Sequence, residues 1–180
     1  MKHAFLVATL VLAATAGPVH ASSAGRCGGT GGGSTKTLTC PAGQYIVGIG
    51  ARAGLVIDEF SIACQKIPVS GAAGSRGGFK SGGPGGGVVS RSAFCKQGQA
   101  VTSITTHSGG FVDKVHSGAC QSRDGDGWKS GNSGVSFAEL DLGGPGGGFC
   151  QLACPQGEAM FKITVKFGGV VDSLRGECRK

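Results

Sequence analysis

The chain has 180 residues, and its 17 lysines and arginines outnumber its 10 aspartates and glutamates, which gives a formal net charge of +7 at pH 7. The basic residues stand singly, without interleaved aromatic rings, which argues against nucleic-acid binding but leaves attraction to anionic cell surfaces open. Glycine contributes 37 residues, yet the Gly-X-Y register of collagen is absent and the 39% hydrophobic content is high for a glycine-rich linker. These numbers favour a compact β-protein with many tight turns.

Residues 1–21 have the pattern of a signal peptide, with a basic start, an apolar run over 4–16 and small residues at the end. The apolar run is too short to cross a membrane. No lipobox precedes Cys27, so we predict a soluble exported protein, secreted or periplasmic, with no membrane insertion. Removal of the signal peptide leaves a single domain, 22–180, with a net charge of about +6.

Eight cysteines in an exported chain predict four disulfides. Three intervals between cysteines have nearly equal lengths of 24, 25 and 24 residues, and we predict a disulfide across each: Cys40–Cys64, Cys95–Cys120 and Cys154–Cys178. Each loop of this size stabilises the fold by roughly 3 kcal/mol in the chain-entropy model. Cys27 and Cys150 are left over, and their pairing, which would tie the N-terminal strand to the third interval, stays open. Zinc binding at Cys150 and Cys154 is the rival interpretation, although no His or CxxC accompanies them.

The three intervals also share a sequence frame. Each has Gly three residues after its first Cys, Ile six residues later, then a basic or imidazole side chain, Gly, Asp, an apolar residue and the closing Cys. A GGxGGG motif precedes each interval, at 28–33, 82–87 and 143–148. We interpret the chain as a threefold internal repeat with units of approximately 28–66, 82–122 and 143–180.

Local patterns within the units predict strands and no helix. The segment 161–167 alternates apolar and polar residues, which is typical of a half-buried strand, and Val56 to Ile62 is a second strand candidate. Three similar all-β units around a shared core predict a three-sided prism of sheets.

One aspartate in each unit is a candidate for binding: Asp58, Asp113 and Asp172. A carboxylate accepts hydrogen bonds from two hydroxyls at once, and a glycine loop presents backbone amides that no Cβ obstructs. The combination fits a ligand rich in hydroxyls and needs no metal or cofactor. The alternative is that each Asp only locks a turn and that the glycine loops are tight strand connections.

The frame GGxGG followed by R-x-G-x-x-x-D-x-apolar resembles the jacalin-related lectin family over nearly all of 28–178. The griffithsin type, with three such repeats in one prism, is the form that it resembles, while the cystines are similar to those of vitelline membrane outer layer protein. The resemblance implies an all-β, β-prism I fold of three Greek-key sheets. It also implies mannose- or galactose-type glycans as partners and no enzymatic activity.

The resemblance further implies which residues would contact a sugar: the Asp carboxylate, two backbone amides just upstream, and an amide of the glycine loop from the next repeat. The first site would comprise Asp58, Leu55, Val56 and Gly86; the second Asp113, Gly110, Phe111 and Gly147; the third Asp172, Gly169, Val170 and Gly32. The family often has a Tyr two residues before the Asp, where its ring stacks on the sugar. Only Phe111 supplies an aromatic ring there, so the second site is the best equipped.

Other features have simpler interpretations. Arg52, His107 and Lys166 share one column of the repeat and are expected at a solvated strand edge. No Ser, Cys or Asp frame accompanies His107, so we predict no enzyme. The segment 124–128 loosely resembles the start of a calcium loop but lacks its later acidic ligands, and we expect an exposed insertion in which Trp128 packs. The alternative function is a non-enzymatic structural or interaction protein on the same scaffold, with degenerate sugar sites.

Overall fold

A computed structural model describes residues 20–125, 127–129, 135–137 and 140–180. The expected signal peptide, 1–21, therefore lies outside the described residues except for its last two positions. Every regular element in the described part is a β-strand. The described residues contain no helix that is long and apolar enough to cross a membrane. The expectation of an all-β protein is confirmed.

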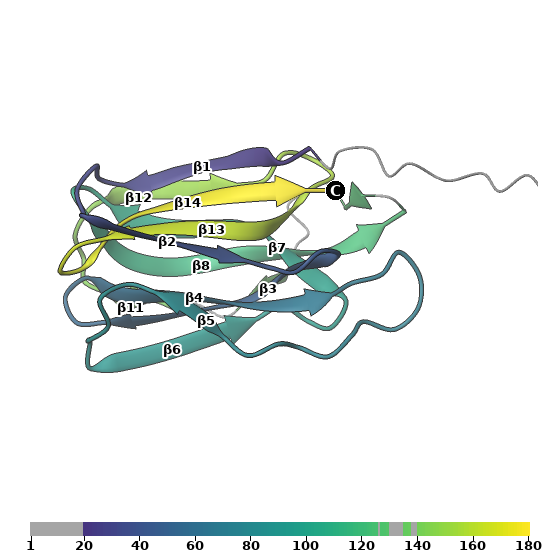
Figure 1. Cartoon of the computed structure of the whole chain (residues 1–180), viewed down its shortest axis with the longest axis horizontal. Helices are drawn as coiled ribbons and strands as arrows, with labels where there is room; N and C mark the ends of the chain where they lie inside the picture. Colours follow the sequence, from purple (N-terminus) through teal and green to yellow (C-terminus); the bar gives the residue numbers. More distant parts are fainter. Residues whose placement is uncertain (1–19, 126, 130–134, 138–139) are drawn as a thin grey trace, which may run out of the picture.

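The strands form three sheets around one interior (Figure 1). Sheet A has the order β1 (Ser22–Gly28), β14 (Val171–Arg179), β13 (Ala159–Phe167), β2 (Ser34–Thr39). Sheet B has the order β5 (Lys80–Gly82), β4 (Ile57–Lys66), β3 (Gln44–Ala53), β6 (Val89–Phe94). Sheet C has the order β10 (Val135–Phe137), β8 (Val112–Asp124), β7 (Gln99–Ser108), β12 (Gly148–Ala153), and β11 (Leu142–Gly143) and β9 (Gly127–Trp128) also pair with β8.

Each sheet has the strand order of a Greek key. In sheet B, β3, β4 and β5 are consecutive neighbours and β6 returns to lie beside β3. Sheet A follows the same order, but it takes its central hairpin, β13–β14, from the C-terminal end of the chain and its outer strands from the N-terminal end. The two ends of the chain therefore close the prism together.

The core lies where the inward faces of the three sheets meet. Strand alternation sends one side chain in two toward this interior, and the cluster takes members from every sheet. Its largest fully buried side chains include Leu38, Phe60, Ile104, Ile163 and Leu174. The predicted strand segments, 161–167 and Val56 to Ile62, fall on β13 and β4.

A second, smaller cluster forms around Trp128, which is 3% exposed. Its ring meets that of Tyr45 edge-on, with centroids 4.8 Å apart. Trp128 therefore packs, as expected. The segment 124–128 is an insertion whose Gly125 is exposed, while its β9 pairs with β8.

Four disulfides join the sheets to one another. Cys40, which follows β2 of sheet A, bonds Cys64 on β4 of sheet B. The two equivalent bonds continue around the prism from sheet B to C and from C to A: Cys95–Cys120 and Cys154–Cys178. The fourth, Cys27–Cys150, joins β1 of sheet A to β12 of sheet C. Cys150 and Cys154 are thus both disulfide-bonded, which leaves no thiolate for zinc.

Candidate functional site

The three candidate aspartates stand at equivalent places, as the second residue of β4, β8 and β14. Before each lies a tight hairpin turn that closes in the same way. The backbone N–H of Gly54 donates to the carbonyl of Val56 at 3.2 Å, and Gly109 and Gly168 donate likewise to Phe111 and Val170. The three hairpins therefore present their aspartates in one common local geometry.

Each aspartate faces the glycine loop that was expected from the next repeat. A Cβ placed on Gly147 would lie 2.5 Å from Asp113 Oδ2, and one on Gly32 would lie 2.7 Å from Asp172 Oδ2. At the first site, a Cβ placed on Gly86 would lie 3.9 Å from the Asp58 side chain, which is an ordinary contact. The close approaches at Gly147 and Gly32 are possible only because these two residues have no side chain.

The first loop differs from the other two by one position. Gly87, with φ of +69°, is the residue whose Cβ would meet Asp58 Oδ2, at 2.9 Å. It thus occupies the place that Gly32 and Gly147 hold at the other sites, one residue later than the motif alignment indicates. The motif alone does not reveal this shift, because both alternative positions, 86 and 87, are glycines.

The three sites also touch one another. The Gly144 N–H of the second loop donates to the Leu55 carbonyl in the first hairpin turn at 3.0 Å. Gly29 of the third loop lies so close to Gly110 in the second turn that a Cβ would come within 2.2 Å of the Gly110 carbonyl oxygen. All three candidate sites therefore lie at the same end of the prism.

The glycine loop at the second site offers a matched pair of substitutions. Gly147 has φ of +72°, and a Cβ there would also meet the Ser108 backbone N at 2.5 Å, whereas a Cβ on Gly148 would meet nothing within 4 Å. We expect Gly147→Ala to lower the free energy of unfolding by at least about 1 kcal/mol and to displace the loop from Asp113. Urea unfolding measures the loss, and a Gly148→Ala control should stay within about 0.5 kcal/mol of the wild type. Equal losses in the two variants would contradict this geometry.

The carboxylates differ in their surroundings. Asp58 is half-buried and its Oδ2 accepts a hydrogen bond from the Gly54 N–H at 2.9 Å, which is the turn-locking arrangement. Asp172 is only 4% exposed, and its buried Oδ2 has no hydrogen-bond partner. Asp113 is half-buried, and no donor in the described part of the chain bonds its carboxylate. Asp113 therefore keeps the most accessible accepting capacity.

The amides upstream of each aspartate are also free to donate. Among residues 20–125 and 140–180, no acceptor takes the backbone N–H of the expected residues, which are Leu55, Val56, Gly110, Phe111, Gly169 and Val170. Phe111 is 46% exposed, so its ring is available to a ligand beside Asp113. The structure thus brings together, at the second site, a carboxylate, two free amides, a glycine loop and an aromatic face.

Two residues of the basic column contact the glycine loops, which the sequence did not lead us to expect. Lys166 Nζ donates to the Thr30 carbonyl in the third loop at 2.6 Å. An Arg52 guanidinium nitrogen lies 3.4 Å from the Gly87 carbonyl in the first loop. These side chains hold the loops to the sheets rather than only lining a solvated edge. The sequence signal that could have indicated these contacts is the equivalent position of the two basic residues in the repeat.

At the second site this column holds His107, and a polar cluster has formed beside it. Lys114, the residue after Asp113, forms an ion pair with Asp141 at 2.9 Å, and His116 Nδ1 lies 3.2 Å from the same oxygen. The His107 and His116 rings are 6.2 Å apart. The hydrogen bond from Lys114, followed by that with His116 and the Lys114 charge, lowers the pKa of Asp141 below its ordinary value. Sequence reasoning missed Asp141 because it lies outside the repeated frame.

This lowered pKa predicts a pH dependence. Because the folded-state pKa of Asp141 lies below the ordinary value of 3.8, the stabilisation is present above that value and is lost as the pH falls through the folded pKa. Asp141→Asn should therefore be less stable than the wild type at about pH 6, and the two should converge near about pH 2. Asn also tolerates the positive φ of 36° at this position, so the change isolates the charge. Urea unfolding across this pH range tests the prediction, and a constant difference would contradict it.

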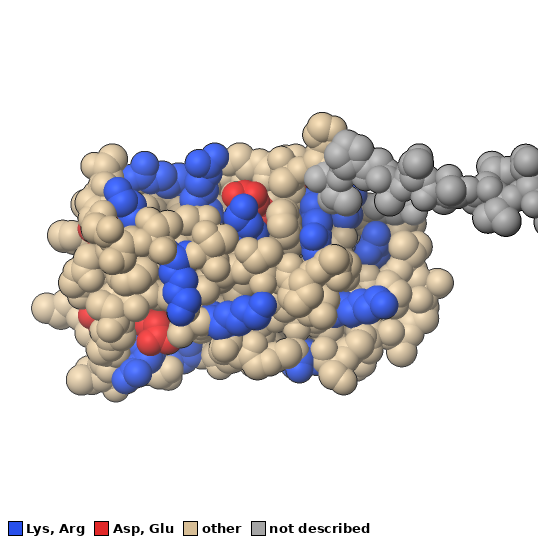
Figure 2. Space-filling view, in the orientation of Figure 1, with Lys and Arg blue, Asp and Glu red and all other residues tan. Residues whose placement is uncertain are grey.

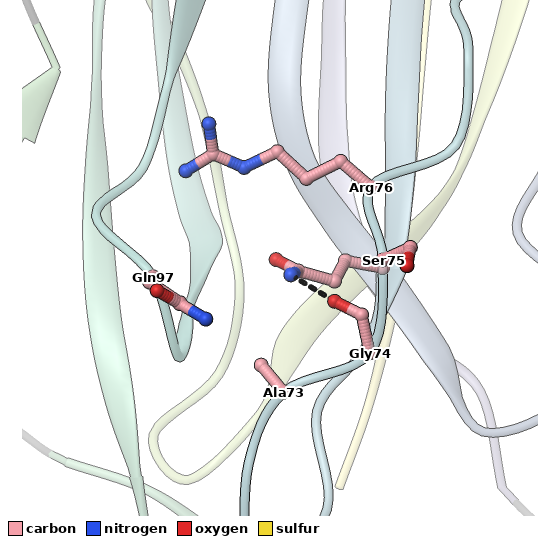
Figure 3. A pocket seen from close by; sticks show the side chains of 6 residues that line it. Ala73, Gly74, Ser75, Arg76 and Gln97 are labelled. Carbon is pink, nitrogen blue, oxygen red and sulfur yellow. Dashed lines mark hydrogen bonds between the residues drawn. The ribbon is translucent and has the colours of Figure 1, made fainter.

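A separate pocket of about 410 Å³ lies at the opposite end of β4 from Asp58. Figure 3 shows Arg76 extending across it, above Gly74 and toward the side where Gln97 lies. Its lining includes Gln65, which is 3% exposed and donates to the Gly74 carbonyl. None of the candidate sugar-binding residues contributes to this pocket.

Charge is spread over the surface. Figure 2 shows lysines and arginines as separate groups on one face, with few acidic residues among them. Within the described ranges, no group of three or more His, Cys, Asp or Glu side chains could hold a metal ion.

Comparison with solved structures identifies the fold. Malaysian banana lectin superposes with a TM-score of 0.59 at 15% identity, covering 89% of this chain and 98% of that one. Artocarpin in complex with mannopentose gives a TM-score of 0.64 at 13% identity, with coverage of 91% and 100%. Calystegia sepium agglutinin gives 0.61 at 15%, with coverage of 90% and 97%. No protein-family model and no curated protein matches the chain.

These neighbours are jacalin-related lectins, so the predicted resemblance is confirmed at the level of the fold. Identities of 13–18% carry the fold and not the specificity of any one neighbour. The chain has the β-prism fold that these carbohydrate-binding lectins share.

Proposed function

We propose that this protein is an exported lectin whose principal sugar site is formed by Asp113, the amides of Gly110 and Phe111, and the loop at Gly147. The observation that carries this proposal is the state of Asp113. Its carboxylate is half-buried, lies against a glycine loop and is bonded by no donor among the described residues. A buried or half-buried acceptor of this kind gains most from a ligand that supplies hydroxyl donors.

The chemistry at this site matches a pyranose. Hydroxyl groups both donate and accept, so a carboxylate and free backbone amides side by side satisfy two or three of them at once. The exposed Phe111 ring provides a face for the apolar C–H groups of the sugar. Support also comes from the neighbours, because artocarpin has been solved with methyl α-mannose and with mannotriose. We therefore favour mannose-type glycans over galactose-type glycans.

The first and third sites are proposed as weaker copies. Asp58 shares its carboxylate with Gly54, and Asp172 is almost fully buried. A single shallow site of this type should bind a monosaccharide with a Kd of about 1 mM. Several such sites at one end of a rigid prism gain affinity for branched glycans through avidity.

The remaining proposals concern context. Four disulfides are typical of extracellular proteins, and we propose export to the periplasm or the cell exterior after removal of residues 1–21, with 22–180 acting as one binding domain. We assign no catalytic role, because the neighbours are lectins and the proposed site uses carboxylate and amide groups only to hold hydroxyls.

The second candidate function is a non-enzymatic structural or interaction protein with degenerate sugar sites. The Asp58–Gly54 hydrogen bond favours it, because at that site the aspartate already locks its own turn. The two functions differ in what they predict for Asp113. A lectin uses its carboxylate to bind a sugar, whereas the turn-locking role does not explain a carboxylate that accepts no hydrogen bond from the described residues.

A glycan array on the wild-type protein, followed by NMR titration with methyl α-mannoside and methyl β-galactoside, tests the proposal. We expect binding of mannose-type glycans and amide shift changes at Gly110, Phe111 and Gly147. The control is a sugar-free buffer that is brought to the same osmolarity with ethylene glycol. It should leave the chemical shifts of these amides unchanged. Absence of array binding, together with no shift changes at about 50 mM monosaccharide, well above the expected Kd, would favour the structural role instead.

A further inference from the structure

A groove of about 350 Å³ runs along the outer face of sheet B. Its floor is a row of four small residues that are register partners across all four strands: Ser81, Ser61, Gly50 and Ser92. Paired residues on neighbouring strands point to the same face, and the next residues along the strands, Ile49 and Phe60, are buried in the core. The row therefore faces away from the interior.

One end of the groove is lined by Phe79, whose ring packs against that of Phe94. Phe79 and Phe94 are 42% and 36% exposed, and their ring centroids are 5.2 Å apart. The Phe94 ring lies directly over Gly48, where a Cβ would come within 2.5 Å of it. Arg76 holds the ring in place, with its guanidinium 4.9 Å from the ring centroid and bonded to the Cys95 carbonyl.

The other end of the groove is charged and opens toward the first sugar site. Arg52 and Glu59 are register partners there and both line the groove. Arg52 reaches the Gly87 carbonyl in the first glycine loop, and Glu59 directly follows Asp58. The charged end of the groove thus lies next to Asp58 and the first glycine loop, through Glu59 and Arg52.

The residues that form this groove are particular to sheet B among the three sheets. Strand register places Thr105 of sheet C and Thr164 of sheet A where sheet B has Gly50. It likewise places Ser103 and Lys162 at the position of Gly48, where Lys162 forms an ion pair with Glu177. The Phe94 position is occupied by Ala153 and Thr39 in the other sheets. A structural need common to three equivalent sheets does not account for the small residues and the Phe94 ring that sheet B alone places at these positions.

We propose that the groove is an extended subsite that binds the inner residues of an oligosaccharide whose terminal sugar occupies the Asp58 site. The aromatic end would pack against the apolar face of a pyranose ring, while the serine hydroxyls, Arg52 and Glu59 exchange hydrogen bonds with its hydroxyls. The volume lies within the range of about 300–1,000 Å³ that small-molecule sites occupy. The proposal rests on the sugar-binding function, and it makes the first site, proposed above as weak for a monosaccharide, a site selective for longer chains.

The test uses Gly50→Thr, which gives sheet B the residue that the other two sheets have. Its Cβ would lie 2.6 Å from Ser61 Oγ, a hydroxyl that can rotate away, and 3.4 Å from the Ser92 Cβ, so that the side chain fills the floor. Phe79→Ala removes the aromatic end independently, and Thr164→Val on the outer face of sheet A is the matched control. Each variant is titrated with methyl α-mannoside and with a mannose pentasaccharide.

We expect the pentasaccharide to bind the wild type more tightly than the monosaccharide does and to shift the amides of Ser61, Ser92 and Phe94. Gly50→Thr and Phe79→Ala should each weaken pentasaccharide binding roughly tenfold, equivalent to about 1.4 kcal/mol, and leave monosaccharide binding unchanged. Wild-type pentasaccharide affinity in both variants, or a pentasaccharide that neither gains affinity nor shifts the groove amides, would overturn the subsite and leave the lectin function standing. Failure of the wild type to bind either sugar would overturn both proposals.

Discussion

Replacement of Cys27 and Cys150 by serine is expected to lower the free energy of unfolding by about 4 kcal/mol, more than the loss of any other disulfide. The bond closes a sequence separation of 123 residues, and the two disulfides inside that span shorten the covalent path to about 74 residues. The other three close separations of 24 or 25 residues, for which the same chain-entropy model gives about 3 kcal/mol.

The position of this bond adds a structural reason. Sheet A is assembled from strands at both ends of the chain, and Cys27–Cys150 fixes its N-terminal strand, β1, to sheet C. Without it, β1 is held by its ladder with β14, the Ser22–Glu158 hydrogen bond and the packing of Ala24, so local opening at the N-terminus becomes easier.

Guanidinium unfolding of the Cys27→Ser/Cys150→Ser variant measures the loss. The matched control is Cys154→Ser/Cys178→Ser, which cuts the other bond between sheets A and C. We expect the control to lose about 1 kcal/mol less than the test variant. A larger loss in the control would show that loop length does not govern the contribution of these bonds.

Much of the fold could be predicted because the same sequence pattern occurs three times along the chain. The nearly equal cysteine spacings indicated three similar units and the alternation in 161–167 a strand, and each unit contains a hairpin such as β13–β14. The repeat pattern does not indicate how the first and last units pair with each other in sheet A. The closure of sheet A depends on β1 and β2 pairing with strands more than a hundred residues away, and no local pattern encodes that contact.

The residues that make up the three candidate sites could be predicted, but the differences among the three sites could not. The repeat placed an aspartate and a glycine loop together three times, yet it could not show that Asp58 accepts from Gly54 while Asp172 is buried. Those differences depend on how each loop seats against its aspartate, including the one-residue shift at Gly87, which nearly identical glycine motifs do not specify. Asp141 and the groove on sheet B escaped notice for a related reason, because each is formed by residues that depart from the repeat.

Asp113→Asn is expected to weaken binding of methyl α-mannoside by roughly 10- to 100-fold. A hydrogen bond to a charged acceptor contributes about 1.5–3 kcal/mol, and the amide keeps the size of the carboxylate while losing its charge and one acceptor. Asp113 has no donor among the described residues, so the substitution breaks no existing bond and its effect on stability should be small.

Asp58→Asn is the matched control, because it makes the same chemical change at a carboxylate whose Oδ2 already serves the Gly54 N–H. We expect it to reduce monosaccharide binding less than threefold, since the amide oxygen can still accept from Gly54 and the site contributes little on its own. Isothermal titration of both variants, with unfolding curves to show that each is folded, gives the comparison. If Asp113→Asn bound the sugar as well as the wild type while Asp58→Asn did not, the principal site would have to be moved from the second repeat to the first.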